Sequence, residues 1–225
     1  MRYLIALMAV LFAVFGFAQR ASALTVGGSG DTYGYTVTGS TYTSTTADWT
    51  MPDYACHADQ GVTLAASWTG LSGGGGTTEQ IGTVMECLDG ATSYYGFYEL
   101  YPSGSIVTFS KPVAAGDKID ASITYNGSSK FTLQLKDVTA AWTQTEVATL
   151  ADATPSTAET AVEGTLEGTG TYYPLCASPG VLSDFTGDTV NGTALGDLDP
   201  VKVTGGDAGV TVSAVNGESF SVTCD

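Results

Sequence analysis

The chain has 225 residues, of which 23 are acidic and seven are lysine or arginine, and its formal net charge is −16 at pH 7. Nucleic acids and anionic membranes are bound through clusters of cationic side chains. The composition therefore argues against both as partners.

The first 23 residues have the features of a secretory signal peptide: Arg2, an apolar run from Tyr3 to Ala18, and the small residues Ala21-Ser22-Ala23. We therefore expect a secreted, monomeric protein with one domain over residues 24–225. No later apolar run approaches the roughly 20 residues that span a bilayer. Both arginines lie in the signal, which leaves five lysines against 23 acids, a difference of −18.

Mutual repulsion among so many carboxylates is expected to raise their pKa values in the folded protein. A carboxyl group with a raised folded pKa stabilises the fold at low pH, and this stabilisation is lost as the pH rises through the folded pKa. The composition therefore predicts a protein that tolerates acid and is weakened toward neutral pH.

The first part of the mature chain predicts short strands separated by small polar residues. Between Thr25 and Thr46, aromatic and small polar residues alternate, and a further strand is expected from Val62 to Trp68. The glycines from Gly73 to Gly76 predict a flexible loop.

The stretch from Trp68 to Pro102 contains aromatic residues, three glutamates and one glutamine in two predicted strands. These strands run from Thr77 to Cys87 and from Tyr94 to Tyr101, joined by a turn at Leu88-Asp89-Gly90. Because side chains alternate along a strand, Gln80 is expected to share a face with the small residues Thr78 and Gly82.

On the second of these strands, Tyr95, Phe97, Glu99 and Tyr101 share one face. This pattern sets a carboxylate in an aromatic wall. Such a face lines either a binding cleft or a core that contains one acid.

A hairpin is expected next, with strands from Ile119 to Tyr125 and from Lys130 to Lys136 joined by an Asn126-Gly127 turn. Residues Thr139 to Thr149 continue as a strand, and Ala151 to Ala158 is expected to be a polar, proline-containing loop.

A second Asn-Gly turn, Asn216-Gly217, is expected to join Val210–Ala214 to Phe220–Cys224. Many short strands, abundant glycine and threonine, and no long stretch of helical period predict an all-β fold. We expect an antiparallel two-sheet β-sandwich of the jelly-roll or concanavalin-like type.

The four cysteines of a secreted chain predict two disulfides. The pairing of nearest neighbours is Cys56–Cys87 with Cys176–Cys224, and the sequence alone permits the other two pairings. A zinc site is the rival interpretation, but no C-x-x-C or H-x-x-x-H spacing exists and His57 is the only histidine. We therefore expect neither a metal nor another cofactor.

Most familiar hydrolytic motifs are absent from the sequence. There is one histidine; the G-x-S-x-G spacing occurs only within the glycine-rich run Gly70-Leu71-Ser72-Gly73-Gly74, and D-T-G, D-S-G and a P-loop are absent. Carboxylates and amides remain. A glutamate that is hydrogen-bonded in its charged form stays ionised in acid, and a glutamine amide does not titrate. A Glu/Gln pair is therefore suited to activating water at low pH.

Six segments resemble, in chain order, motifs of the glutamic peptidases, the eqolisin or scytalidoglutamic-type family. They are Tyr33-Gly34-Tyr35, Trp49-Thr50-Met51-Pro52, Trp68-Thr69-Gly70-Leu71, Glu79-Gln80-Ile81-Gly82-Thr83, Tyr95-Gly96-Phe97-Tyr98-Glu99-Leu100-Tyr101-Pro102 and Ala115-Gly116-Asp117-Lys118-Ile119. The resemblance covers nearly the whole mature chain. It implies a jelly-roll-like sandwich that cleaves proteins at acid pH with one Gln and one Glu.

The resemblance also implies the site residues. The family's catalytic Glu lies in A-E-x-x-x-E, a spacing that Ala158-Glu159 and Glu163 supply. Gln80 and Glu163 are thus the expected catalytic pair. Trp68 and Glu99 match residues that line the cleft.

Phe97 and Tyr95 stand in the same aromatic wall as Glu99 and are expected to contact substrate. The chain departs from the family's usual residues at four positions, Ser72, Phe97, Thr160 and Gly164.

Other functions fit the residues when they are taken one at a time. Taken alone, Gln80 is interpreted as a glutamine that makes only structural hydrogen bonds within a sheet. Glu163 alone is interpreted as a solvent-exposed carboxylate on a strand. A carbohydrate-binding jelly-roll module and a glycosidase that uses Glu99 with Glu163 remain alternatives. We expect a metal-independent, acid-acting endopeptidase that pepstatin does not inhibit, whose partners are protein or peptide substrates.

Overall fold

The computed structural model describes residues 31–39, 41–58, 61–73, 76–164 and 174–225. The predicted signal peptide over residues 1–23 lies outside this part. The regular secondary structure of the described chain is almost entirely β-strand, with one short 3-10 helix, η2 (Leu195–Asp197), among the described residues. No helix in these ranges is long and apolar enough to cross a membrane.

Seven antiparallel strands form the first sheet, in the order β13-β1-β10-β3-β4-β5-β6. Their bounds are β1 Thr32–Thr38, β3 Thr63–Gly73, β4 Thr77–Leu88, β5 Ala91–Tyr101, β6 Val107–Pro112, β10 Pro155–Glu163 and β13 Val201–Val203.

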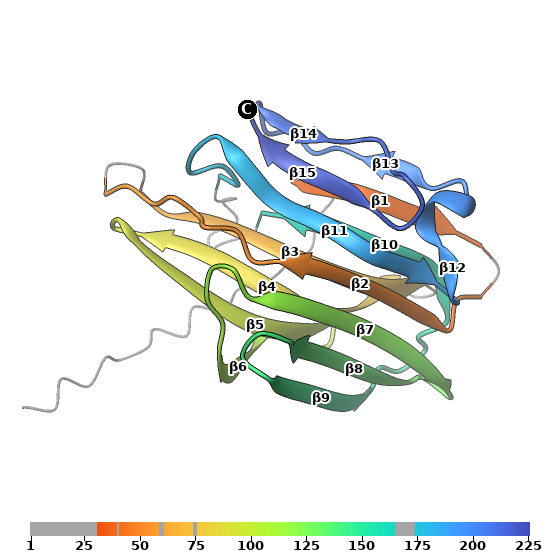
Figure 1. Ribbon diagram of the computed structural model, residues 1–225. Coiled ribbons are helices and arrows are strands. Elements are labelled where there is room, and N and C mark those ends of the chain that lie inside the picture. The colour runs from red at the N-terminus through yellow and green to blue at the C-terminus, as the bar shows by residue number, and fades with distance from the viewer. Residues whose placement is uncertain (1–30, 40, 59–60, 74–75, 165–173) are drawn as a thin grey trace, which may run out of the picture.

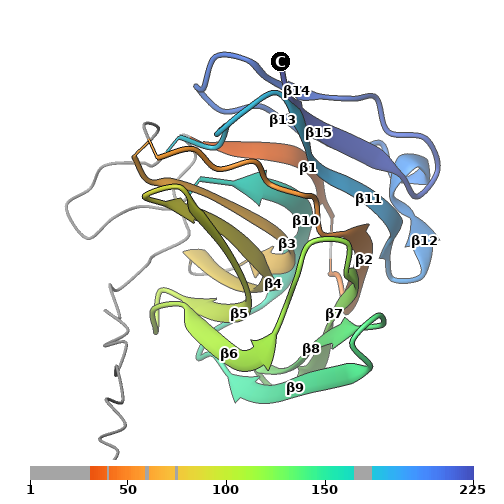
Figure 2. The same cartoon turned by 60° about the vertical axis from the view of Figure 1, so that its left-hand side comes forward.

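The second sheet has eight strands, in the order β14-β15-β11-β2-β7-β8-β9, with β12 paired to β11. Their bounds are β2 Ser44–Thr50, β7 Lys118–Gly127, β8 Lys130–Asp137, β9 Trp142–Thr149, β11 Gly180–Val190, β12 Thr193–Ala194, β14 Val210–Val212 and β15 Phe220–Cys224. The two sheets lie face to face (Figures 1 and 2). The predicted antiparallel two-sheet sandwich is confirmed.

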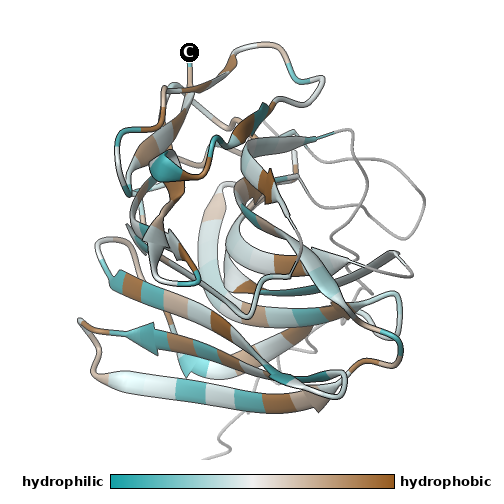
Figure 3. Cartoon of the chain, turned by 90° about the vertical axis from the view of Figure 1, so that its right-hand side faces the viewer, coloured by the Kyte–Doolittle hydropathy of each residue, from teal (hydrophilic) through white to brown (hydrophobic). Residues whose placement is uncertain are grey.

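The main core fills the space between the sheets. Large side chains from both sheets are fully buried there: Tyr33, Ile81, Met85, Ile119, Phe131, Leu133 and Phe185. The Trp49 indole N–H crosses the interior and donates to Thr83 Oγ1 at 2.9 Å. Hydrophilic and hydrophobic bands alternate along many strands (Figure 3), as expected for strands with one buried face.

Both predicted Asn-Gly hairpins are confirmed. Strands β7 and β8 pair in register from Ile119↔Asp137 to Tyr125↔Phe131, with a register shift before Gly127. Strands β14 and β15 pair from Val210↔Cys224 to Val212↔Val222.

The prediction of a loop over Ala151–Ala158 is wrong in its second half, because β10 begins at Pro155. A proline is tolerated as the first residue of a strand, where its missing N–H costs no ladder bond, and the register shifts directly after it. Neighbouring strands on both sides then supply pairing and burial that outweigh the polar composition. Strand β11 was not predicted at all.

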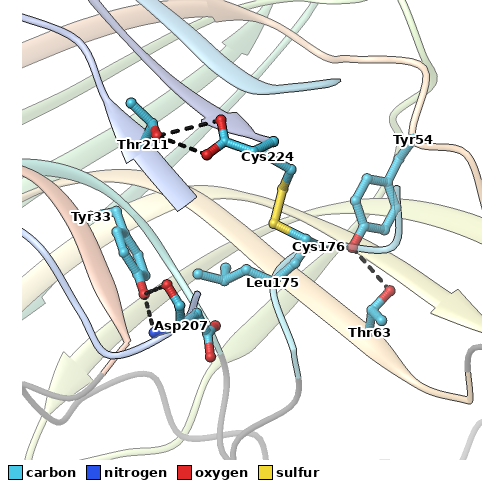
Figure 4. The surroundings of a disulfide bond; sticks show 9 residues. Tyr33, Tyr54, Thr63, Leu175, Cys176, Asp207, Thr211 and Cys224 are labelled. Carbon is cyan, nitrogen blue, oxygen red and sulfur yellow. Dashed lines mark hydrogen bonds between the residues drawn. A yellow bond between two sulfur atoms is a disulfide. The ribbon is translucent and has the colours of Figure 1, made fainter. Parts of the chain in front are cut away.

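Both disulfides form between nearest neighbours, Cys56–Cys87 and Cys176–Cys224, so the default pairing is confirmed. Cys224 is on β15, and Cys176 lies in the segment that follows residue 173 (Figure 4). Beside this bond, the Tyr54 hydroxyl hydrogen-bonds to the Leu175 carbonyl at 2.6 Å. The segment before β11 is therefore fixed to the sandwich at two neighbouring points.

Candidate active site

One row of residues crosses the middle of the first sheet and contains Gln80. Glu159 on β10, Gly70 on β3, Gln80 on β4 and Glu99 on β5 are direct cross-strand partners. Side chains that oppose one another in antiparallel strands point to the same face. Because Gly70 has no side chain, the Gln80 amide stands between two carboxyl-bearing strands.

Two further rows place the other candidate residues on this face. Trp68 lies opposite Gly82, which lies opposite Phe97. Two residues further along, Glu163 and Tyr95 mark the two ends of the row Glu163–Ala66–Val84–Tyr95. Positions two apart on a strand share a face, so the structure brings all six predicted site residues to one face.

This face of the first sheet points away from the second sheet. Its apolar residues form a separate buried cluster, distinct from the core between the sheets: Leu64, Ala66, Trp68, Val84, Phe97 and Ala161. We call it the outer face.

Glycines on the outer face allow close contact between strands. A Cβ added at Gly82 would lie 2.0 Å from the Ser67 carbonyl oxygen, closer than any side chain tolerates. At Gly70 a Cβ would lie 2.8 Å from the Trp68 ring, so the indole rests on the space that this glycine leaves. These positions explain why glycine interrupts otherwise regular strands.

A short hydrogen bond joins the two polar residues at the centre of the face. Gln80 Nε2 donates to Glu99 Oε2 at 2.7 Å, and both side chains are buried. The bond fixes the orientation of the amide, because its nitrogen faces Glu99. The prediction that Glu99 lies in an aromatic wall is confirmed by Phe97 and Tyr95 on the same strand face.

The pKa of Glu163 is raised to about 8, and burial is the largest cause; the nearby Glu159 and Glu99 contribute to the rise, while the Thr32 hydroxyl and the Trp68 indole oppose it. The expectation that a catalytic glutamate here is held ionised by hydrogen bonds is therefore wrong for the conformation described. The Trp68 indole N–H lies near enough to affect this pKa, but it makes no hydrogen bond of standard geometry with a described residue.

Burial also raises the pKa of Glu159 to about 7. Other acids in the described chain follow the same direction, with burial as the largest cause for each: Asp31, Asp48, Glu79, Asp137 and Asp188. The predicted rise of carboxyl pKa values thus has desolvation as its main cause, and repulsion is secondary.

The outer face is closed in this conformation. Gln80 is 1% exposed, Glu163 2% and Trp68 3%. The interpretation of Glu163 as a solvated strand carboxylate is therefore wrong. Any substrate that reaches these residues requires this face to open.

The sequence did not single out Glu159 as a member of the Gln80 row. Its position became visible only from the register, which pairs Glu159 with Gly70 and Gly70 with Gln80. Of the departures from the family's residues, Ser72 is hydrogen-bonded to Thr78 at 3.2 Å and Thr160 lies in the interior. The described residues include no group of three His, Cys, Asp or Glu positioned to hold a metal ion.

Solved structures of similar fold include a scytalido-glutamic peptidase with a transition-state analogue inhibitor, at 19% identity and a TM-score of 0.73, covering 87% of this chain and 98% of that one. SCP-B, a member of the eqolisin family solved with the tripeptide Ala-Ile-His, matches at 17% identity and a TM-score of 0.65, with the same coverage. Aspergilloglutamic peptidase from Aspergillus niger matches at 22% identity and a TM-score of 0.59, covering 72% of this chain and 99% of that one.

No curated protein sequence matches the chain. The model of the Peptidase A4 family, in contrast, matches residues 30–223, which is almost the entire described sandwich. The chain therefore belongs to the Peptidase A4 family, the eqolisin or glutamic peptidases.

Proposed function

We propose that the protein is a secreted endopeptidase that acts in acid and hydrolyses peptide bonds with a water molecule activated by Glu163 and Gln80. The observation that carries the proposal is the shared outer face, where the register places Gln80, Glu163, Trp68 and Glu99 together in a chain of a peptidase family. Peptides as substrates are supported by the ligands of the similar structures, a transition-state analogue and a tripeptide. Two disulfides are typical of an oxidising compartment and support secretion.

The mechanism begins with opening of the outer face. Burial is the largest cause of the raised pKa of Glu163, so the opening that admits a substrate also returns water to this carboxyl group and lowers its pKa. At low pH, Glu159, whose pKa is raised to about 7, is neutral and no longer opposes ionisation of Glu163. Glu163 then becomes the carboxylate of the site.

In the chemical step, the Glu163 carboxylate takes a proton from a water molecule, and the water oxygen attacks the scissile carbonyl carbon. One N–H of the Gln80 amide donates to the oxygen that becomes negatively charged, while the other is directed at Glu99. Glu163 returns its proton to the leaving amine, and the C–N bond breaks. Atoms and charge balance without a covalent intermediate.

Substitution of the two residues tests the proposal. Glu163→Gln and Gln80→Ala should each lower casein or haemoglobin hydrolysis at pH 3 to 4 by at least about a hundredfold. Glu86→Gln is the matched control, since Glu86 is also on β4 and its exposed carboxyl accepts a hydrogen bond from Ser93 on β5. Wild-type activity in Glu163→Gln would refute the assignment.

Inhibitors give a second, independent test. Activity at pH 2 to 7 should persist with pepstatin and with a chelator, because neither an aspartic dyad nor a metal is part of the proposed mechanism. Loss of activity to a chelator would contradict it.

A further inference from the structure

The outer face becomes more exposed from one row of residues to the next along its strands. Glu163, Trp68 and Gln80 lie in three successive rows, and all three are buried. The row after that of Gln80 carries only hydroxyl side chains, which are half-buried or exposed: Thr38 on β1, Thr157 on β10, Ser72 on β3, Thr78 on β4 and Tyr101 on β5. We call it the hydroxyl row. The outer face is therefore open to solvent at this row.

Glu159 lies at the boundary between the closed and the open part of the face. It belongs to the Gln80 row, directly beside the hydroxyl row. It is half-buried, whereas Gln80 and Glu99 in the same row are fully buried. Of the two carboxyl groups in this row, that of Glu159 is the one that a ligand can reach before the buried cluster moves.

Glu159 is also close to the expected position of the scissile bond. Gln80 lies two strands away in the same row, which corresponds to about 10 Å between the Cα atoms, and Gly70 between them has no side chain. The Trp68 ring rests over Gly70 and lines the space between the two polar residues. Residues of an extended peptide follow one another at about 3.4 Å. A substrate whose carbonyl oxygen faces Gln80 therefore brings a side chain within two residues of this bond to Glu159.

The described chain supplies no cation to Glu159. The one salt bridge among the described residues joins Lys136 to Asp120 on the second sheet. On the first sheet, Lys202 of β13 lies two strands from β10, and its amine donates to the Val212 carbonyl at 2.8 Å. A carboxyl group at the entrance of the site thus has no ion-pair partner within this part of the protein.

We propose that Glu159 is a specificity-determining residue that forms an ion pair with a lysine or arginine side chain of the substrate, within two residues of the scissile bond. The inference rests on the proposed function. An ion pair is stronger where water is partly excluded, so a half-buried carboxyl group discriminates more sharply between charged and neutral side chains than an exposed one does.

The preference depends on pH, because only the ionised carboxyl group attracts a cation. Burial raises the pKa of Glu159 to about 7. The residues that flank it on β1 and β3, Thr36 and Gly70, do not titrate, and the charged groups that share its face, Glu163 and Glu99, are acids. A substrate cation lowers the pKa of Glu159. The preference for lysine should therefore be weak at pH 3.5 and grow toward pH 6.

The experiment compares peptides that carry either lysine or norleucine, its uncharged isostere, at each of the four positions nearest the scissile bond. In the wild type, kcat/KM for lysine relative to norleucine should rise by about tenfold between pH 3.5 and 6 at one of these positions. In Glu159→Gln this ratio should not change with pH. Both rates are measured on one variant, so a change in folding or in general activity cancels.

Glu86→Gln is the control for net charge. It removes an acid of β4 outside the Gln80 row and should keep the wild-type ratio at both pH values. The same ratio in the wild type and in Glu159→Gln would overturn the inference, and so would an equal loss of the preference in Glu86→Gln, since the charge of the whole protein would then be its cause.

Peptide binding provides a readout that needs no catalysis. Calorimetry at pH 6 should show that Glu163→Gln binds the lysine peptide about tenfold more tightly than the norleucine peptide, and that the double variant with Glu159→Gln binds the two equally. Binding without a preference for lysine, or no binding of either peptide, would contradict the role of Glu159. A wild type that hydrolyses no peptide would refute the proposed function, and the binding comparison would still decide this role.

Discussion

Gln80 and Glu99 are direct cross-strand partners, and the Gln80 amide donates to the Glu99 carboxyl at 2.7 Å. The orientation of the amide is thus set by the register of β4 and β5 and does not depend on a loop. Gly70, the partner of Gln80 on β3, adds no side chain to this row, and the Trp68 ring rests on the space that it leaves. The sheet itself aligns the group that we assign to the oxyanion.

Replacing the acceptor tests this relationship. In Glu99→Gln the new side chain can both donate and accept hydrogen bonds, so the orientation of the Gln80 amide is less defined. We expect kcat at pH 4 to fall by about tenfold and KM to change little. Steady-state kinetics on a peptide substrate measure both, with Glu86→Gln as the control. An unchanged kcat would show that Glu99 does not orient the amide.

Trp68 affects the pKa of Glu163, and its loss should move the acid limb of the pH profile. The indole lowers this pKa, so in Trp68→Phe it is higher and a smaller fraction of Glu163 is carboxylate at a given acid pH. The acid limb of kcat between pH 2 and 7 should therefore shift to higher pH. Trp142→Phe, at an indole that donates to the Pro112 carbonyl, is the control and should leave the limb in place.

Gly82 is required by the distance between β3 and β4. In Gly82→Ala the new Cβ would lie 2.0 Å from the Ser67 oxygen and 2.8 Å from the Trp68 Cα, so the backbone must move. We expect a loss of about 3 kcal/mol or more in the free energy of unfolding. Gly104→Ala, with nothing within 4 Å of the new atom, should change it by less than about 0.5 kcal/mol. Urea unfolding at pH 4 measures both; equal effects would contradict the close approach.

Glu79 is fully buried between the sheets, and burial raises its pKa from an ordinary 4.5 to about 8. An acid with a raised folded pKa contributes stability that is complete below the unfolded value and is lost as the pH rises through the folded value. Glu79→Gln removes this dependence. Between pH 4.5 and 8, the free energy of unfolding of the variant should rise relative to that of the wild type, by on the order of a few kcal/mol. Glu146→Gln on edge strand β9 is the control. A constant difference across this range would mean that Glu79 is already ionised.

The whole protein should follow the same direction, because the pKa values of Asp48, Glu159 and Asp188 also rise, to about 6, 7 and 7. Each acid costs stability only above its unfolded pKa. Melting temperatures from pH 3 to 8 should therefore be highest in the acid part of the range and fall toward pH 8. A maximum near pH 8 would refute the prediction.

The sequence was sufficient for those elements whose local pattern agrees with their environment. Two Asn-Gly turns and the alternation around Gln80 and Glu99 predicted the hairpins and the shared face correctly. The disulfides match the nearest-neighbour pairing, one of the three that the sequence permitted. These features depend on neighbours in sequence, which a single chain displays directly.

What the sequence could not provide depends on pairing between distant segments. Strand β10 begins in a polar segment with a proline, and only β1 and β3 on its two sides make it a central strand. The inward Asp188 depends on a bulge against β2, and the raised pKa of Glu163 depends on burial. Neither the pairing register of distant strands nor the burial of a side chain can be predicted from the local periodicity of the sequence.

The central place of β10 has a consequence for the order of assembly. Its residue Glu163 pairs with Thr32 on one side and Ala66 on the other, so β1 and β3 have no contact through the sheet until β10 enters between them. During synthesis, β1 and β3 cannot pair with β10 until residues 155–163 have been made, and contacts this distant in sequence form slowly. A nascent or truncated chain that stops before residue 155 has Gln80 and Glu99 but lacks Glu163, so the pair to which we assign catalysis is complete only after β10 has been synthesised.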